Sequence, residues 1–144
     1  MADWNRRFLD LCDVVAGWSK DPSTKVGAVI TDNDNRVISV GYNGFPRKAD
    51  DKNKERYERP LKYRWTEHAE RNAIYNAAKI GVSTDEATMY IRWFPCTDCA
   101  RGIIQSGIKK LVCSKPDFTD ERWGADFKIS HEMLEECGIT LEFE

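Results

Sequence analysis

His68-Ala69-Glu70 and, further along, Pro95-Cys96-Thr97-Asp98-Cys99 are the two stretches around which this chain is organised. One imidazole and two thiols separated by two residues can supply three ligands to a tetrahedral zinc ion. Three protein ligands leave the fourth position open for water, which distinguishes a catalytic zinc from a closed structural site. The spacing therefore predicts that His68, Cys96 and Cys99 bind a catalytic zinc.

Glu70 stands two residues after the histidine, where its carboxyl can carry protons for a reaction at the metal. Zinc brings the pKa of its bound water close to neutrality, so that hydroxide is present at pH 7. This hydroxide can add to a carbon that bears an amino group, provided that a neighbouring acid protonates the ring nitrogen and later carries a proton to departing ammonia. We assign this catalytic role to Glu70. The pattern His-x-Glu…Pro-Cys-x-x-Cys resembles the signature of zinc-dependent nucleobase deaminases.

A lone Cys-x-x-Cys pair has other interpretations, because it also occurs as a redox pair, as half of a structural zinc site, or by chance. A structural site needs a fourth protein ligand, for which the chain offers Cys12, Cys113, Cys137 and His131. None of these makes a second close pair. The catalytic interpretation is favoured because the histidine, the glutamate, the proline and both cysteines fall into one pattern.

The length of 144 residues predicts one domain, residues 1–144, which is large enough to bury a core without disulfides. The five cysteines are an odd number that includes the proposed zinc pair, so a disulfide framework is not expected. The net charge of −2 gives no sign of the basic face with which proteins grip long nucleic acids. The N-terminus lacks a signal-peptide core and no apolar run approaches membrane-spanning length, so we expect a cytoplasmic protein with no membrane contact.

Hydrophobic periodicity and turn residues predict helices and strands that alternate along the chain. The helices are expected over residues 3–18, 66–79, 97–106 and 131–137, and the strands over residues 25–31, 36–42, 88–94, 110–114 and 139–144. Thr66 is expected to cap the second helix, and Gly81 lies just past its end. The alternation predicts a three-layer α/β/α sandwich around one five-stranded mixed sheet, whose last two strands are parallel because a helix joins them.

The segments that connect these elements include two that bear on function. Residues 41–46, Gly41-Tyr42-Asn43-Gly44-Phe45-Pro46, form either an ordinary turn or a turn that brings Asn43 to a polar ligand beside the zinc, and the pattern leaves both open. Residues 47–65 are strongly polar and are expected to form a solvated loop. Because this loop lies between the turn and His68, it is a candidate lid over the site. Residues 115–127 are expected to be irregular.

Beyond the zinc motif, the chain resembles the deoxycytidylate (dCMP) deaminases of the cytidine deaminase superfamily over nearly its whole length. Phe45 and Glu67 depart from the methionine and the cysteine that are common there. The resemblance implies hydrolysis of dCMP to dUMP and ammonia, which supplies the precursor of thymidylate. The motifs that carry it are Ser19-Lys20-Asp21-Pro22, Val26-Gly27-Ala28, Gly41-Tyr42-Asn43-Gly44, His68-Ala69-Glu70-Arg71-Asn72-Ala73-Ile74, Phe94-Pro95-Cys96-Thr97-Asp98-Cys99-Ala100 and Ile103-Ile104-Gln105-Ser106-Gly107-Ile108.

The resemblance also implies roles for individual residues. Zinc would be held by His68, Cys96 and Cys99, with one zinc per chain and with Glu70 as the proton shuttle. Substrate contacts are expected from Asn43, Ala69 and Phe94, and residues 47, 48 and 64 are candidates for the 5′-phosphate because they lie near the site in the chain: Arg47, Lys48 and Arg64. Hexamers are implied that dCTP activates and dTTP inhibits. The triphosphate would bind with Mg²⁺ at a second site that consists of Lys20, Asp21, Gly41, Tyr42, Asn43, Gly44 and Phe45.

Three other functions share part of this pattern. A tRNA adenosine deaminase has the same zinc motif, but the acidic pI near 5.8 and the Gly-Tyr-Asn-Gly turn argue against it. A deaminase of free cytidine or of a pterin precursor would be told apart by its indifference to a 5′-phosphate. A zinc-containing regulatory module without chemistry is a different class, and the intact Glu70 argues against it.

Overall fold

The computed structural model describes residues 2–144 and contains one five-stranded sheet. Its strands are β1 (Gly27–Thr31), β2 (Val37–Tyr42), β3 (Thr88–Ile91), β4 (Lys110–Cys113) and β5 (Thr140–Phe143), and they lie in the order β2-β1-β3-β4-β5. β1 runs antiparallel to β2 and β3, whereas β3, β4 and β5 run parallel to one another. The prediction of a mixed sheet with a parallel last pair is confirmed.

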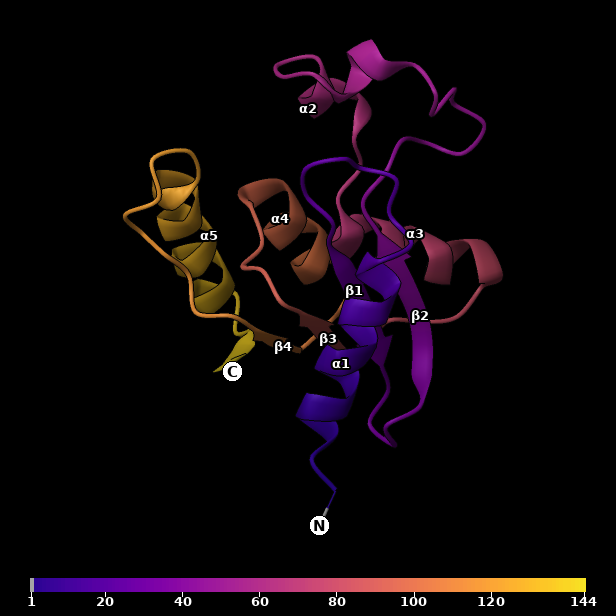
Figure 1. Ribbon diagram of the computed structural model, residues 1–144. Helices are drawn as coiled ribbons and strands as arrows, with labels where there is room; N and C mark the ends of the chain where they lie inside the picture. The colour runs from indigo at the N-terminus through magenta and orange to yellow at the C-terminus, as the bar shows by residue number, and fades with distance from the viewer. Residues whose placement is uncertain (1) are drawn as a thin grey trace.

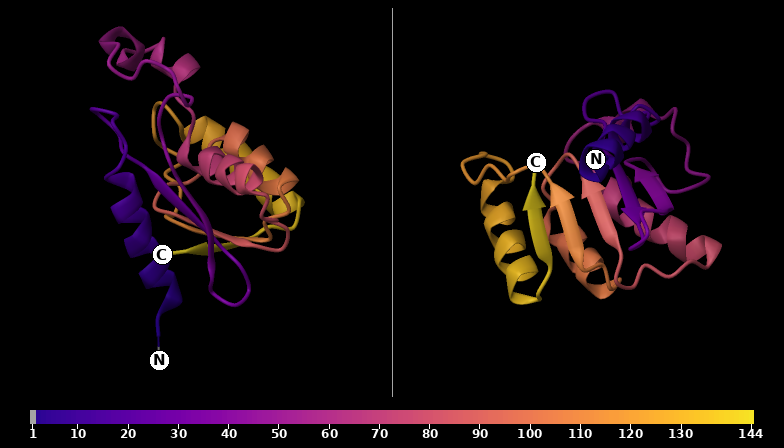
Figure 2. Two further views of the ribbon diagram at one scale, coloured as in Figure 1. Left: turned by 90° about the vertical axis from the view of Figure 1, so that its right-hand side faces the viewer. Right: turned by 90° about the horizontal axis from the view of Figure 1, so that it is seen from below.

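Helices cover both faces of this sheet, as Figure 1 and Figure 2 show. The four long helices are α1 (Trp4–Ala16), α3 (Ala69–Ile80), α4 (Thr97–Gln105) and α5 (Gly124–Glu136). α1 lies on one face, and α3, α4 and α5 lie on the other. The predicted three-layer α/β/α sandwich is therefore confirmed. Within residues 2–144, no helix combines the length and the apolar composition that crossing a membrane requires.

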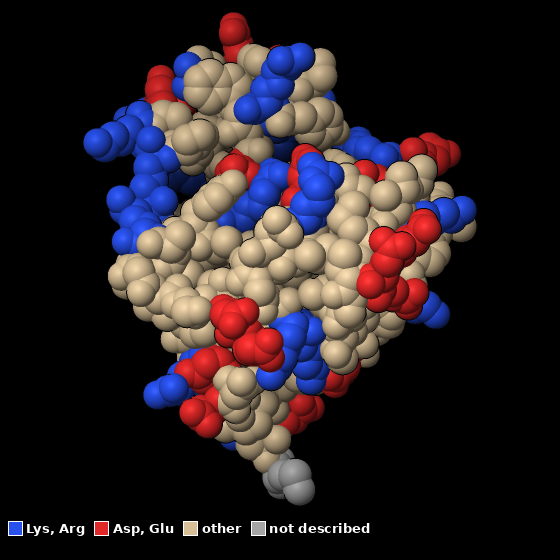
Figure 3. Space-filling view, turned by 180° about the vertical axis from the view of Figure 1, so that it is seen from behind, with Lys and Arg blue, Asp and Glu red and all other residues tan. Residues whose placement is uncertain are grey.

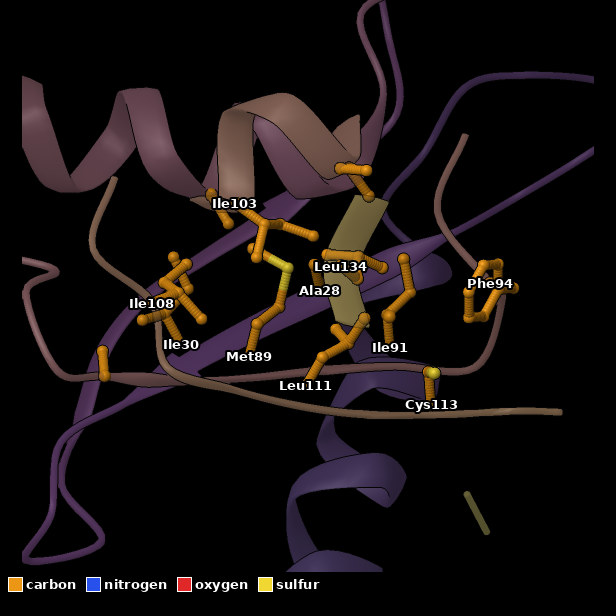
Figure 4. Packing of buried hydrophobic residues seen from close by; sticks show 14 of the residues in the cluster. Ala28, Ile30, Met89, Ile91, Phe94, Ile103, Ile108, Leu111, Cys113 and Leu134 are labelled. Atoms are coloured by element: carbon orange, nitrogen blue, oxygen red, sulfur yellow. The ribbon is translucent and has the colours of Figure 1, made fainter. Parts of the chain in front are cut away.

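The core follows from the alternation of side chains along the strands. Val29 pairs with Tyr90, which in turn pairs with Val112, and this row packs against α1. The next row along the strands points to the opposite face, where Met89 and Leu111 pack beneath α3, α4 and α5 (Figure 4). The three central strands, β1, β3 and β4, thus bury both of their faces, which explains why they read as continuous apolar runs.

The start of α3 differs from the prediction. Thr66 does not cap this helix, because a short helix, α2 (Lys62–Trp65), precedes it and Thr66 ends α2, with its N–H donating to the Lys62 carbonyl at 2.9 Å. His68 is the N-cap of α3 instead and has extended backbone angles (φ −75°, ψ 155°). His68 therefore lies just before the first helical turn, and Glu70 lies within it. Gly81 ends the helix in the left-handed conformation (φ 86°), as predicted.

The last helix is longer than predicted, because α5 begins at Gly124 and not near residue 131. The carboxylate of Asp120 accepts hydrogen bonds from the N–H groups of Arg122 and Trp123 (2.9 and 2.8 Å), which fixes the turn that leads into the helix. Gly124 is required there, since a Cβ atom would lie 2.3 Å from the Phe118 carbonyl oxygen. The prediction of an irregular segment over residues 115–127 was therefore wrong from Gly124 onward, where α5 begins.

The polar segment before His68 is more ordered than the predicted loop. It contains a 3₁₀ helix, η1 (Lys54–Tyr57), as well as α2. The ring of Phe45 stacks on Tyr57 with centroids 4.5 Å apart, and the guanidinium of Arg56 lies 3.7 Å from the ring centroid of Trp65. These contacts form a small aromatic core of the segment itself. Residues 46–66, which we call the lid, stand apart from the sheet and its helices at the top of Figure 1.

Candidate metal centre and substrate cavity

The three predicted zinc ligands lie at the N-termini of two neighbouring helices. His68 is the N-cap of α3, Cys96 is the N-cap of α4, and Cys99 lies in the first turn of α4. Neither N-cap side chain bonds to its own helix, so the imidazole and the thiol are free to turn toward each other. The positive end of a helix stabilises thiolate, which is the form that binds zinc.

The distances within this group fit a zinc ion. His68 Nδ1 lies 3.5 Å from Cys96 Sγ and 3.4 Å from Cys99 Sγ. Zinc bonds of about 2.3 Å to sulfur and about 2.0 Å to nitrogen at a tetrahedral angle place the two ligand atoms about 3.5 Å apart. Across residues 2–144, this is the one group of three or more histidine, cysteine and acidic side chains close enough to hold a metal ion. The donor set and its spacing are those of a zinc site with three protein ligands.

The two thiols differ in acidity. The pKa of Cys96 is lowered to about 4, first by its hydrogen bond with Cys99 and then by its hydrogen bond with His68, against the opposing effect of burial. The pKa of Cys99 is raised well above its usual value by the hydrogen bond with Cys96 and by burial. One thiolate therefore forms without difficulty beside the imidazole. Metal binding must release the proton of the other thiol.

Glu70 lies in the first turn of α3, where its side chain is 4% exposed and lines the same cavity as His68 and Cys96. Burial raises the pKa of its carboxyl group, because the charged form loses its hydration. A raised pKa is the shift that a proton carrier near neutral pH requires, since the group must both hold and release its proton.

Asp126 fixes the loop that carries the two cysteines. Its carboxylate accepts hydrogen bonds from the N–H of Thr97 (2.8 Å) and from the hydroxyl of Thr97 (2.9 Å). Thr97 lies between the cysteines, so α5 supports the first turn of α4 through this contact. Sequence analysis did not single out Asp126, because it belongs to the segment that was expected to be irregular.

A cavity of about 690 Å³ opens above the metal centre. Its wall is formed by the lid, by residues 120–123 and by the loop that precedes β1. Aromatic rings contribute to the lining: Trp123 lies edge-on to His68 and to Tyr63 of the lid, with ring centroids 6.4 and 6.3 Å apart, respectively. The residues that line the cavity are Asp21, Thr24, Val26, Asn43, Arg59, Lys62, Tyr63, Thr66, His68, Ala69, Glu70, Trp93, Phe94, Cys96, Asp120, Glu121, Arg122, Trp123 and Phe127.

A family model described as the cytidine and deoxycytidylate deaminase zinc-binding region matches residues 2–115. The chain belongs to this family. An uncharacterized deaminase in the luxG 3′ region of Aliivibrio fischeri is 41% identical over an alignment that covers 98% of this chain and 93% of that protein. The deoxycytidylate deaminase of Homo sapiens is 34% identical, over 96% of this chain and 78% of the human protein.

Solved structures add a match in fold. The dCMP deaminase of the cyanophage S-TIM5, crystallised with dCMP and dUMP, aligns with a TM-score of 0.77 over 96% of this chain and 95% of that one. Its sequence identity is 22%, so this likeness concerns the fold alone. The sequence-based resemblance to the deoxycytidylate deaminases is confirmed by the family model and by the relatives together.

Three residues expected to contact substrate in this deaminase, Asn43, Ala69 and Phe94, line the cavity. Asn43 is 6% exposed. Its Oδ1 accepts a hydrogen bond from the Val26 N–H (2.9 Å), and its Nδ2 donates one to the Thr24 carbonyl (2.8 Å). Both sides of the amide are therefore held by the loop before β1, and one N–H of the amide is left for a ligand.

None of the three basic residues predicted for the phosphate lines the cavity, and their role stays a prediction. Arg47 donates a hydrogen bond to Asn76 on α3 and is not part of the cavity wall. Arg64 is outside the cavity lining too, because residues two apart on a helix face different sides and Lys62 is the one that turns inward. Lys48 likewise does not line the cavity. The basic residues that line the cavity are ones that sequence analysis missed: Arg59, Lys62 and Arg122.

The residues predicted for a second, regulatory site each contact a different part of the protein. Lys20 forms an exposed ion pair with Asp51 of the lid, Asp21 is buried against Lys62, and Tyr42 lies edge-on to Trp18. The other members of the set are occupied as follows: Gly41 is packed under α3, Gly44 is bridged to Glu67, and Phe45 is stacked on Tyr57. The regulatory site stays a prediction.

Proposed function

We propose that this deaminase hydrolyses dCMP to dUMP and ammonia. The observation that carries the proposal is the group His68, Cys96 and Cys99 together with the buried carboxyl of Glu70, at a cavity that His68, Cys96 and Glu70 line. The choice of dCMP is supported by the relatives named deoxycytidylate deaminase, of which the human protein is one. The cavity volume of about 690 Å³ is ample for a whole nucleotide and lies in the range typical of small-molecule sites.

The residues of the chain divide the chemistry among them. When bound, zinc supplies the Lewis acid that turns water into a nucleophile at neutral pH. His68, Cys96 and Cys99 would hold the ion. Glu70 would take a proton from the attacking water and pass it to N3 of the cytosine ring as the oxygen adds to C4. It would then pass the second proton of that oxygen to the amino group, which leaves as ammonia when the C4–N bond breaks and the C4 carbonyl forms. Phe94 and Trp93 would exclude bulk water from the ring.

Arg59 and Arg122 are the residues we propose for the 5′-phosphate. Both line the cavity, Arg59 from the lid and Arg122 from the segment just before α5. Among the ion pairs within residues 2–144, neither guanidinium has a carboxylate partner, whereas Arg36, Arg71, Arg92 and Arg101 each have one. The lid carries eight lysines and arginines against four acidic residues, and Figure 3 shows such basic side chains gathered around the upper part of the molecule. An unpaired guanidinium is well suited to a phosphate, which it can bind with two hydrogen bonds.

The proposal is tested by ammonia release from dCMP, deoxycytidine, dCTP, cytidine and adenosine under identical conditions. We expect kcat/KM for dCMP to exceed that for deoxycytidine at least 100-fold. Arg59→Gln together with Arg122→Gln should remove most of this preference, and Arg64→Gln should keep it. If dCMP and deoxycytidine react equally well, or if another substrate reacts faster than dCMP, the proposed substrate is wrong.

We further propose that the enzyme is a hexamer, activated by dCTP and inhibited by dTTP, each with Mg²⁺. The support is the resemblance, together with the position of Lys20, whose exposed ammonium could exchange Asp51 for a phosphate. The test is the rate as a function of dCMP concentration with each triphosphate and Mg²⁺, repeated with Lys20→Ala. Hyperbolic kinetics that ignore both triphosphates would remove the regulatory site and leave the deaminase. A cytoplasmic location also stays a prediction.

A further inference from the structure

A buried ion pair joins the lid to the body of the protein. Lys62 of α2 and Asp21 of the loop before β1 are 41 residues apart in sequence, and their side chains are 6% and 2% exposed. Lys62 Nζ lies 2.9 Å from Asp21 Oδ2, 3.0 Å from Asp21 Oδ1 and 2.8 Å from Ser23 Oγ. The ammonium has three N–H donors, and all three therefore have acceptors in one loop.

This pair is an unusual way to attach the lid. The two charges lose their hydration on burial, so an apolar contact of similar size would often stabilise the protein as well or better. The other ion pair between lid and body, Lys20 with Asp51, is exposed and contributes little. What a buried, fully hydrogen-bonded pair does supply is a single defined geometry.

Hydrogen bonds connect the Asp21–Lys62 pair to the side chain of Asn43. Asp21 Oδ1 also accepts hydrogen bonds from the backbone N–H groups of Ser23 (2.9 Å) and Thr24 (3.1 Å). The carbonyl of Thr24 accepts from Asn43 Nδ2, and the N–H of Val26 donates to Asn43 Oδ1. The Ser19 hydroxyl donates to the Asn43 carbonyl at 2.8 Å. The orientation of the Asn43 side chain is therefore fixed by the loop before β1, and the conformation of that loop depends on Asp21.

On the lid side, Lys62 has two cavity-lining neighbours. Tyr63 follows it and packs edge-on against Trp123, and Arg59 lies three residues earlier with its guanidinium 5.8 Å from the Tyr63 ring centroid. A change at Lys62 moves these side chains together with the lid.

We infer that Asp21 and Lys62 are positioning residues, which hold the lid and Asn43 in one shared arrangement around the substrate. Neither residue takes part in the chemical step. Their contact aligns the two walls of the cavity, so its loss weakens substrate binding while zinc and Glu70 stay in place. The kinetic side of this inference rests on the proposed function, whereas the structural side does not.

The test uses Lys62→Met and the double variant Asp21→Asn with Lys62→Met. Methionine keeps the aliphatic bulk, and asparagine at position 21 keeps an oxygen for the N–H groups of Ser23 and Thr24. The double variant leaves no unpaired buried charge and folds even where the single variant is destabilised. The matched control is Lys110→Met, which removes a part-exposed ion pair with Glu142 at the end of the sheet.

Three measurements are made on each protein: zinc content, KM and kcat for dCMP, and the rate of tryptic cleavage within the lid, which carries eight lysines and arginines. We expect both position-62 variants to retain zinc, to raise KM at least tenfold with kcat changed less than KM, and to be cleaved in the lid at least tenfold faster. The Lys110→Met control should match the wild type.

A double variant with KM and lid cleavage both within twofold of wild type overturns the inference, and so does a loss confined to kcat. If the wild-type protein does not release ammonia from dCMP, the proposed function fails. The lid-cleavage comparison then decides the structural part of the inference separately.

Discussion

Gly41 offers a sharp test of how the catalytic helix is held against the sheet. A Cβ atom at this position would lie 2.2 Å from the backbone nitrogen of Ala73 and 2.6 Å from the carbonyl oxygen of Ala69, both on α3. Ordinary contacts begin at 3.4 Å, so Gly41→Ala must push α3 away from β2 by about 1.2 Å. The obstructing atoms belong to the backbone and cannot rotate aside.

Two consequences follow for the variant. Overpacking of a core costs about 1–3 kcal/mol and occasionally more, and a clash with backbone places this case at the upper end. We expect Gly41→Ala to lose about 3 kcal/mol of unfolding free energy or more, a large share of the about 5–15 kcal/mol that such domains possess. Because α3 carries Glu70 and follows directly on its N-cap His68, a shift of about 1 Å should also lower kcat/KM by about 100-fold in the folded protein.

Urea unfolding, zinc content and ammonia release from dCMP measure these effects. Gly102→Ala is the matched control, since its Cβ would meet only ordinary contacts at 3.5 Å (Arg71) and 3.7 Å (Ile74), and alanine favours the α4 helix by up to about 1 kcal/mol. If Gly41→Ala keeps wild-type stability and activity, close packing of α3 is not the reason for glycine at this position. The expectation that Gly41 serves a phosphate would then regain support.

Three further predictions concern the metal, the proton carrier and acid stability. Glu70→Gln should keep zinc and fold but lower kcat by about 10²–10⁴-fold, as expected when a positioned acid–base group is lost; a residual rate above about a tenth of wild type would exclude Glu70 from that role. Cys99→Ala, or a strong chelator applied to the wild type, should remove zinc and lower the melting temperature, because metal binding is coupled to folding; a Cys99→Ala protein with full zinc content and activity would refute the ligand assignment. The pKa of Asp21 lies below its usual value, because hydrogen bonds from Lys62, Ser23 and Thr24 outweigh the opposing effect of burial. A carboxyl whose pKa is lowered on folding stabilises the folded protein at pH values above its unfolded-state pKa of about 3.9. This stabilisation is lost as the pH falls through the folded-state pKa. Urea unfolding between pH 7 and pH 3 should therefore show a steeper acid loss for wild type than for Asp21→Asn, and identical slopes would mean that Asp21 is not ionised and paired in the folded state.

The sequence alone identified what depends on short-range spacing. The zinc ligands and Glu70 are recognisable because Cys96 and Cys99 must meet one ion and Glu70 must reach the reacting group beside His68, which restricts both residue type and separation. The sandwich was predictable because amphipathic helices leave a periodic pattern and buried strands leave short continuous apolar runs, as in β1, where Val29 and Ile30 pack on opposite faces. Gly81 marked the end of α3 because left-handed backbone favours glycine.

Tertiary structure decided what depends on residues far apart in the chain. Nothing near Lys62 in sequence indicates that it is buried, because its partner Asp21 lies 41 positions away and neither residue shows its pairing locally. For the same reason Arg47 and Arg64, which lie close to the site in sequence, do not line the cavity, whereas Arg122, which follows β4 in the chain, does. Chain proximity determines which residues share a turn or a helix face. The placement of charges around a cavity depends instead on how separate elements pack, and that is fixed only when the hydrophobic layers come together.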